Sequence, residues 1–298
     1  MECTLCPRRC RADRDRLSGY CGEQGEASVT RAALHFGEEP VISGTRGSGT
    51  VFFSGCSLHC VFCQNRDISG GSARLAHRAN AVHVSPDRLR ELYFKLIDAG
   101  AHNINLVTPT HFSDVIAKSL EPGLPVPVIW NSSGYESVET LRKLEGLISV
   151  YMPDYKYSSP LLAEEYSNAP DYPSVAHAAV CEMIRQTGRP VCDGDGMLVR
   201  GTLIRHLVLP GAGKNTRGVI DAVAGLPGGS FIFSLMAQYT PPEGIGAEYP
   251  ELGRGITEAE YNRAADYLAL SGIEHCYLQG LDSATEEMLP VFDGTGTV

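Results

Sequence analysis

The sequence predicts an α/β fold whose mostly parallel sheet forms a partial (βα)6 TIM-like barrel of about six strand–helix units. Short apolar runs bounded by glycine or proline recur along the chain, as buried strands require. Between these runs lie segments with apolar residues every three or four positions, a spacing typical of amphipathic helices. Strands that alternate with helices pair in parallel through right-handed crossovers, and near-continuous apolar strands indicate burial on both faces.

The composition is that of an ordinary globular protein, with 298 residues, 43% hydrophobic and 20% charged. The net charge of −10 and the absence of a long basic run predict no binding to nucleic acid or to an anionic membrane. No apolar stretch approaches the roughly 20 residues that span a bilayer. Ten cysteines without a signal-peptide pattern predict metal ligands and free thiols rather than disulfides. We therefore expect the protein to reside in a reducing, oxygen-poor cytoplasm.

The first element in the chain is a cysteine-rich metal-binding segment, expected over residues 1–35, ahead of a barrel over residues 36–298. It carries Cys3, Cys6, Cys10 and Cys21 at C-x2-C-x3-C-x10-C spacing. Four thiolates hold either structural zinc or a second [4Fe-4S] cluster, and the knuckle-like spacing slightly favours zinc. So short a segment cannot fold on a hydrophobic core, so the metal would stabilise it. Four arginines are expected to lower the pKa of these thiols, namely Arg8, Arg9, Arg11 and Arg14.

The second element is a strand over residues 49–54 that leads into a loop with Cys56, Cys60 and Cys63 at C-x3-C-x2-C spacing. An iron–sulfur cube takes one thiolate per iron, so three thiolates leave the fourth iron open to a small molecule with an amine and a carboxylate. Phe62 would shield such a cluster from water. The alternatives are a zinc loop completed by a distant ligand, or three unrelated buried thiols.

The remaining elements alternate in the order that a parallel sheet requires. A helix over residues 85–100 begins at the capping residue Ser85 and ends at Gly100. Later helices are expected over residues 112–120, 137–144, 173–187, 215–224 and 257–272, the last opened by a capping box. Strands are expected over residues 103–107, 126–130, 147–152, 202–209, 230–235 and 275–279. Residues 155–173 and 241–250 leave strand ends and are expected to be lids or ordinary surface loops.

Polar residues recur where the predicted strands end, which is where barrel enzymes place their sites. These residues are Thr108, Thr110, Asn131, Ser132, Asp154, Lys156, Gln238 and Tyr239. A surface ion pair is the alternative for Asp154 and Lys156, and capping of the next helix is the alternative for Asn131 and Ser132. The scattered thiols of Cys181, Cys192 and Cys276 are expected in the core, as is His206.

The loop with Cys56, Cys60 and Cys63 resembles the signature of the radical S-adenosylmethionine (SAM) superfamily in its spacing, in the aromatic residue before the third cysteine and in the preceding strand. The resemblance implies that these cysteines hold a [4Fe-4S] cluster whose open iron binds SAM. It further implies one-electron cleavage of SAM to a 5′-deoxyadenosyl radical, which abstracts a hydrogen atom from a substrate. A reductant such as flavodoxin or ferredoxin is then required.

Within that superfamily, the chain is similar to the pyruvate formate-lyase activating-enzyme branch and looks most like its PflX-type relatives. Asp154-Tyr-Lys156 matches the Asp-x-Lys of that branch. The match implies that Lys156 pairs with the SAM carboxylate and that Asp154 holds a hydroxyl, a water or a cation. Asn131-Ser-Ser-Gly134 is similar to another strand end of that branch, and Gln238 or Tyr239 would contact the ribose.

Two features depart from that branch. Thr108-Pro-Thr110 stands where the branch has a Gly-Gly-Glu-Pro segment that takes the SAM amino group. The cysteine-rich segment precedes the barrel, whereas activating enzymes with extra clusters carry them after the three cysteines.

The resemblance implies a SAM-dependent radical enzyme whose substrate is a protein, for example at a backbone glycine, or a small molecule or peptide. The alternative is a zinc- or iron-binding, non-catalytic interaction protein on a barrel scaffold. A hydrolase is disfavoured, because the sequence has no G-x-S-x-G elbow and no H-E-x-x-H pattern.

Overall fold

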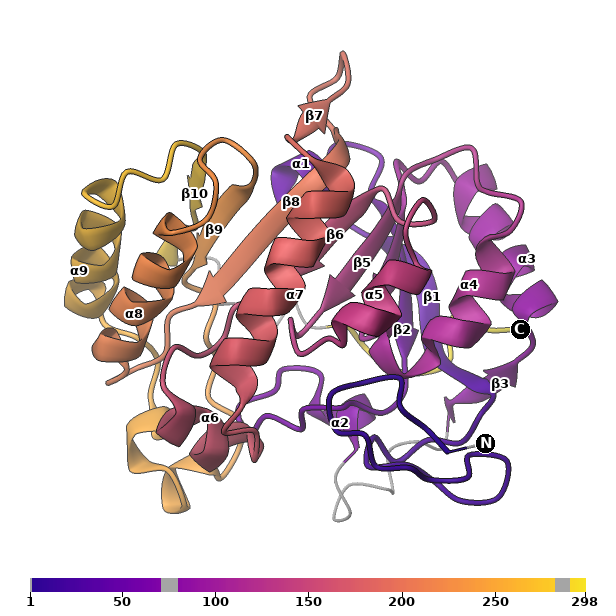
Figure 1. Ribbon diagram of the computed structural model, residues 1–298, viewed down its shortest axis with the longest axis horizontal. Coiled ribbons are helices and arrows are strands. Elements are labelled where there is room, and N and C mark those ends of the chain that lie inside the picture. Colours follow the sequence, from indigo (N-terminus) through magenta and orange to yellow (C-terminus); the bar gives the residue numbers. More distant parts are fainter. Residues whose placement is uncertain (1, 71–79, 282–289) are drawn as a thin grey trace.

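A computed structural model describes residues 2–70, 80–281 and 290–298 (Figure 1). Its centre is a ten-stranded sheet in the order β10-β9-β8-β6-β5-β4-β2-β1-β3, with β7 paired to β8. The pairs from β2 through β10 along this order are parallel, whereas β1 is antiparallel to β2 and to β3. The α/β class with a mostly parallel sheet is therefore confirmed.

The strands are β1 (Ala27–His35), β2 (Ser48–Phe53), β3 (Val82–Val84), β4 (Ile104–Val107), β5 (Val128–Ser132), β6 (Val150–Pro153), β7 (Val191–Cys192), β8 (Leu198–Leu207), β9 (Ile232–Met236) and β10 (Cys276–Leu278). The helices are α1 (Pro40–Ser43), α2 (Arg66–Ser69), α3 (Pro86–Asp98), α4 (Ser113–Leu120), α5 (Val138–Lys143), α6 (Pro160–Ser167), α7 (Tyr172–Thr187), α8 (Gly213–Ala224) and α9 (Glu258–Ala269). Short 3-10 turns are η2 (Thr110–Phe112), η3 (Ile245–Ala247) and η4 (Pro250–Gly253).

Helix α3 shows how the local sequence sets these boundaries. The Ser85 hydroxyl accepts a hydrogen bond from the Arg88 amide, and Pro86 occupies the first turn. The helix buries an apolar stripe that includes Leu89 and Leu92. Gly100 follows the helix with a φ of +98°, a conformation that side chains other than glycine rarely adopt. At α9 the expected capping box is also present.

Both faces of the sheet are buried, which accounts for its near-continuous apolar strands. On one face, Trp130 and Tyr151 pack in an apolar cluster with residues of α3, α4, α5 and α7. Ile129 and Val150 point to the opposite face and pack with Ile42 of α1. In Figure 1 the helices α3, α4, α5 and α7 lie in front of the sheet and α1 lies behind it.

On the face of the sheet that α1 covers, the side chains of β5 and β8 change from apolar to polar along the strand. Side chains two residues apart share one face of a strand. Ile129 and Leu203 are buried apolar residues on this face, and two residues further on stand Asn131 and Arg205, which line a pocket. The carboxyl ends of β5 and β8 thus carry polar groups while their amino ends complete the core.

Four expectations from the sequence differ from the structure. Strand β1 lies within residues 1–35, which were expected to form the cysteine-rich segment. The sequence did not predict this strand, because its alanines weaken the strand pattern. Strand β5 continues to Ser132, which pairs with Pro153, so Asn131 and Ser132 belong to the strand and do not cap the next helix.

The other two differences concern burial. Residues 155–173 form a packed segment that includes α6, because their tyrosines and alanines are buried, so a loosely anchored lid is wrong. Cys181, Cys192 and Cys276 are exposed and do not lie in the core. Cys181 is exposed although its neighbours Val180 and Glu182 in α7 are buried, so the residue type of a lone cysteine does not fix its burial. His206 is buried as expected, between the Tyr155 carbonyl and the Thr216 hydroxyl.

Residues 2–26, here called the N-terminal segment, lie at the end of the sheet toward which the parallel strands run (Figure 1). Helices α2 and α6 lie at the same end. Within the described ranges, none of the helices has both the length and the apolar character needed to cross a membrane.

Candidate active site

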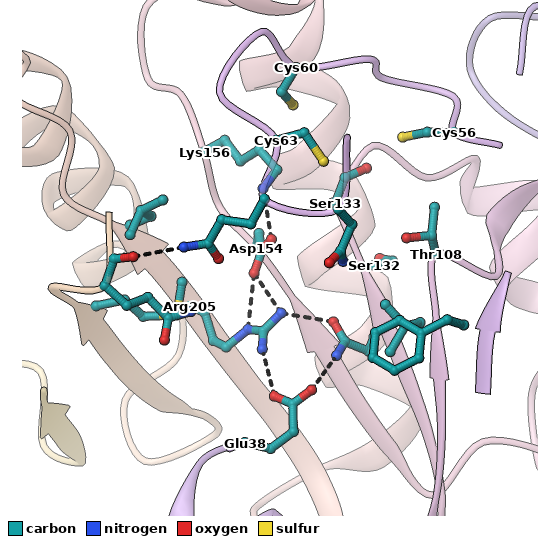
Figure 2. Close-up of a pocket in the computed structure, with 18 of the residues that line it drawn as sticks. Glu38, Cys56, Cys60, Cys63, Thr108, Ser132, Ser133, Asp154, Lys156 and Arg205 are labelled. Atoms are coloured by element: carbon teal, nitrogen blue, oxygen red, sulfur yellow. Dashed lines mark hydrogen bonds and ion pairs between the residues drawn. The ribbon is translucent and has the colours of Figure 1, made fainter. Parts of the chain in front are cut away.

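A pocket opens at the carboxyl ends of the parallel strands (Figure 2). Its wall comes from the loop between β2 and α2, from the ends of β4, β5, β6, β8 and β9, and from the end of β1 with the residues that follow it. The lining residues include His35, Glu38, Cys56, Cys60, Phe62, Cys63, Gln64, Thr108, Asn131, Ser132, Ser133, Asp154, Lys156, Arg205, Leu207, Met236 and Gln238.

The cysteine loop is held in a fixed shape by backbone hydrogen bonds. The Gly55 amide donates to the Ile68 carbonyl (2.7 Å) and the Cys63 amide donates to the Cys60 carbonyl (3.1 Å). Gly55 has a φ of +81°, and a Cβ there would lie 2.7 Å from the Cys21 carbonyl oxygen. Glycine is therefore required at the point where the chain leaves β2.

The three thiols of the loop face the same pocket, as the labelled sulfur atoms in Figure 2 show. Burial raises the pKa of Cys56, and it raises the pKa of Cys63 to about 12. The neighbouring thiols raise both values further, and the Lys156 ammonium opposes the rise. Three thiolates this close are unfavourable without a cationic centre to bind, so the donor set fits an iron–sulfur cluster.

Across the described parts of the chain, no group of three or more His, Cys, Asp or Glu side chains is arranged to hold a single metal ion. A [4Fe-4S] cluster takes one thiolate on each of its irons.

Below the cysteines lies an ion network centred on Asp154 and Arg205 (Figure 2). The Lys156 ammonium is 2.7 Å from one oxygen of Asp154, and the Arg205 guanidinium is 2.9 Å from the other. Burial alone would raise the pKa of Asp154, but Arg205 and Lys156 outweigh it and lower that pKa. Asp154 also raises the pKa of Lys156 against the effect of burial, so the pair is ionised.

Glu38 closes the network on the far side. Its carboxylate is 3.0 Å from the Arg205 guanidinium and accepts hydrogen bonds from the side-chain amides of Asn105 and Asn131, each 3.0 Å long. The Asn131 oxygen in turn accepts from Arg205 (2.8 Å). Two cations and two carboxylates thus balance on the pocket floor, and their geometry is over-determined.

The structure brings most of the predicted polar residues to this pocket, because Thr108, Asn131, Ser132 and Gln238 line it together with Asp154 and Lys156. The side chains of Asp154 and Lys156 are 18% and 17% exposed, so they form a pocket pair rather than a surface pair.

Two predicted residues lie elsewhere. The Thr110 hydroxyl donates to buried Glu136 (2.6 Å), and the Tyr239 hydroxyl donates to the Leu252 carbonyl (2.6 Å). Both side chains are buried away from the pocket lining, because η2 and the segment after β9 turn them into the core.

The sequence interpretation missed Glu38, Arg205 and Glu136. Arg205 carried a usable signal, since a cation between Leu203 and Leu207 in an apolar strand requires a buried partner. Glu38 follows strand β1, which the sequence did not predict, and no sequence signal marked it as a pocket residue. Burial raises the pKa of Glu136 to about 7 although Thr110, Trp130 and Ser132 donate hydrogen bonds to it.

An aromatic wall that includes Phe62 stands beside the cysteine loop. Its ring packs edge-on against Tyr157 and Tyr166, with centroids 6.2 and 6.1 Å away. The Lys156 ammonium lies 5.9 Å from the centre of the Phe62 ring. These rings exclude water from the side of the loop that faces α6.

The cysteines of the N-terminal segment do not line this pocket. Cys6 and Cys21 are buried, whereas Cys10 is exposed. Burial raises the pKa of Cys6 to about 12 and that of Cys21 to about 11, and the opposing effect of Arg14 on Cys21 is smaller. Arg14 thus lowers the pKa of Cys21 as expected, but burial outweighs this effect and the pKa is raised.

Comparisons with known proteins give fold likenesses at low identity, and no family model matches the chain. An uncharacterized protein of Methanocaldococcus jannaschii is 28% identical over 269 residues, which cover 89% of this chain and 73% of that protein. SuiB of Streptococcus suis, solved with S-adenosylmethionine, superposes with a TM-score of 0.49 at 13% identity over 78% of this chain. The chain spans about half of SuiB, 50% of its length.

A domain of a pyruvate-formate lyase-activating enzyme from Bacteroides vulgatus is similar with a TM-score of 0.38 at 13% identity. The match covers 71% of this chain and 96% of that domain.

Proposed function

We propose that this protein is a radical SAM enzyme. The observation that carries the proposal is that the thiols of Cys56, Cys60 and Cys63 share one pocket with the ionised pair of Asp154 and Lys156. The three thiols would hold a [4Fe-4S] cluster. When bound and reduced, that cluster supplies the electron that cleaves SAM to methionine and a 5′-deoxyadenosyl radical.

The residues of the chain bind and orient SAM in this proposal. Lys156 uses one of its three N–H groups on Asp154, which leaves two for the carboxylate of SAM. Asp154 keeps the ammonium charged and fixes its position through Arg205. Gln238 lines the same pocket, and its side-chain amide would supply a polar contact for the ribose.

The substrate in this proposal is a protein or peptide, or a small molecule, that loses a hydrogen atom to the radical. The Asp154-x-Lys156 motif supports an activating-enzyme-like, PflX-type reaction, which would act on a backbone glycine of a partner protein. A one-electron donor such as flavodoxin or ferredoxin would supply the reducing equivalent. The N-terminal cysteines would hold zinc or a second cluster.

The test is anaerobic reconstitution with iron and sulfide, followed by measurement of 5′-deoxyadenosine after addition of dithionite and SAM. We expect 5′-deoxyadenosine from the parent protein. Lys156→Ala should weaken SAM binding roughly 10- to 100-fold, because a hydrogen bond to a charged group contributes about 1.5–3 kcal/mol. Its iron content should stay unchanged.

The matched control is Lys143→Ala, since Lys143 is exposed on α5, far from the pocket lining. A parent protein that binds no iron–sulfur cluster, or that cleaves no SAM, would overturn the proposed function. Unaltered SAM affinity in Lys156→Ala would remove only Lys156 from the site.

A further inference from the structure

We propose that the N-terminal segment positions the cysteine loop, and that Arg8 is the positioning residue that joins them. The cysteine loop is defined here as residues 54–63. The inference rests on the proposed function for the cluster in that loop, but the task that it assigns to the N-terminal segment does not depend on a metal bound by its cysteines.

Arg8 ties three separate parts of the chain together. Its Nε donates to the Ser57 carbonyl of the cysteine loop (2.8 Å). The two terminal nitrogens donate to the carbonyls of Ser167 (2.8 Å) and Asn168, at the end of α6. Only a guanidinium offers N–H groups in such a fork, whereas an ammonium acts as a point donor.

Two aromatic rings fix the direction of the Arg8 side chain. The guanidinium carbon lies 4.2 Å from the ring centre of Tyr20 and 5.2 Å from that of Tyr135. Tyr20 belongs to the N-terminal segment and Tyr135 follows β5. The rings hold Arg8 in the orientation that satisfies all three carbonyls, so its hydrogen bonds need little further ordering.

The backbone of the N-terminal segment holds the cysteine loop at further points. The Cys56 amide donates to the Cys21 carbonyl (3.3 Å), which joins one predicted metal ligand directly to another. The Ser54 hydroxyl donates to Glu23 (2.7 Å), and a ring nitrogen of His59 lies 3.0 Å from the Tyr20 carbonyl. Contacts at residues 54, 56, 57 and 59 therefore fix the half of the loop that carries Cys56 and Cys60.

The position of the N-terminal segment depends in turn on these contacts. The segment buries Cys6 and Cys21 but has no strand or helix assigned among its described residues. The segment is held instead by its hydrogen bonds to the cysteine loop and to the end of α6. Loss of Arg8 would release the cysteine loop from the end of α6, and the loop would then hold its cluster less tightly.

The experiment compares Arg8→Gln, Arg8→Lys and Arg9→Gln in the reconstituted full chain. Arg9 is the neighbouring arginine, and its side chain is exposed. Two rates are measured, namely deuterium uptake by the peptide that contains residues 54–63 and loss of iron to a chelator. In Arg8→Gln we expect both rates to rise roughly tenfold, because charge-assisted hydrogen bonds are lost.

Arg8→Lys should give smaller increases, and Arg9→Gln should match the parent protein. Equal deuterium uptake in Arg8→Gln and Arg9→Gln would overturn the inference. If Arg8→Gln does not fold, the test rests on Arg8→Lys. Deuterium uptake in Arg8→Lys equal to that in Arg9→Gln would then overturn the inference. Failure of the proposed function is distinguishable, because the parent protein would then bind no cluster while deuterium uptake by the loop could still be compared.

Discussion

The two cysteine-rich regions differ in what surrounds them. Cys56, Cys60 and Cys63 line a pocket whose floor is a network of partly buried ions. The N-terminal cysteines are absent from that lining and range from buried Cys6 to exposed Cys10. The thiols of the first set therefore adjoin a space that could take a bound molecule. A count of cysteines and their spacing therefore cannot separate a reactive centre from a supporting one, whereas the surrounding side chains can.

The largest expected effect separates the two sets by their chemistry. Cys56→Ala should abolish 5′-deoxyadenosine formation, by at least about 100-fold, because the cluster then lacks one of its three thiolates. Cys10→Ala, at an exposed position, should retain measurable cleavage and the iron of the cysteine loop. Metal content and 5′-deoxyadenosine are measured in both variants. Equal losses in the two would erase the distinction drawn here.

The next effect concerns the ion network below the pocket. Arg205→Met should lower the free energy of unfolding by about 3–5 kcal/mol, because Glu38 and Asp154 would be left buried without their common cation. Arg88→Met is the matched control, since Arg88 pairs with exposed Glu91 one turn along α3 and should cost about 0–1 kcal/mol. Guanidinium denaturation measures both. Similar values would mean that the network is not the rigid floor described.

A smaller effect is expected on the pH dependence of stability, and it arises from Glu136. This carboxyl receives hydrogen bonds from Thr110 and Ser132, and it raises the pKa of Cys6. Its pKa of about 7 in the folded state exceeds the ordinary value of 4.5, so the folded state binds more protons between these values. Protonated Glu136 contributes fully to stability below about pH 4.5, and this contribution is lost as the pH rises through 7. The free energy of unfolding should fall by roughly 2–4 kcal/mol over that range.

Anaerobic denaturation of the metal-loaded protein between pH 5 and pH 8 checks this prediction. Glu136→Gln should flatten the pH dependence, since the amide does not titrate. A parent profile that is already flat, or a variant that declines as the parent does, would show that Glu136 is not the group responsible.

The sequence was sufficient for the parallel part of the sheet, because its strands are apolar, short and separated by well-capped helices such as α3 and α9. It failed at β1, whose pairing with β2 is set by tertiary contacts rather than by its alanine-rich pattern. Asp154 and Lys156 could be placed because they directly follow a strand. Glu38 could not, because its partner Arg205 is 167 residues away in the chain.

The inward direction of Thr110 and Tyr239 was also beyond the sequence. Each follows a strand, as the pocket residues do, but the local turn decides which side of the backbone each side chain takes. The Glu136 carboxylate and the Leu252 carbonyl offer these hydroxyls partners inside the core. Such choices depend on contacts between segments that neither periodicity nor spacing records.

The change from apolar to polar residues along the inner face of the sheet has a practical consequence for protein engineering. Leu207 and Met236 line the pocket from the last positions of β8 and β9. They stand outside the ion network and beyond the apolar layer on the same face of the sheet. A mutagenesis library restricted to these two positions would reshape what the pocket accepts while the scaffold and its charges stay intact.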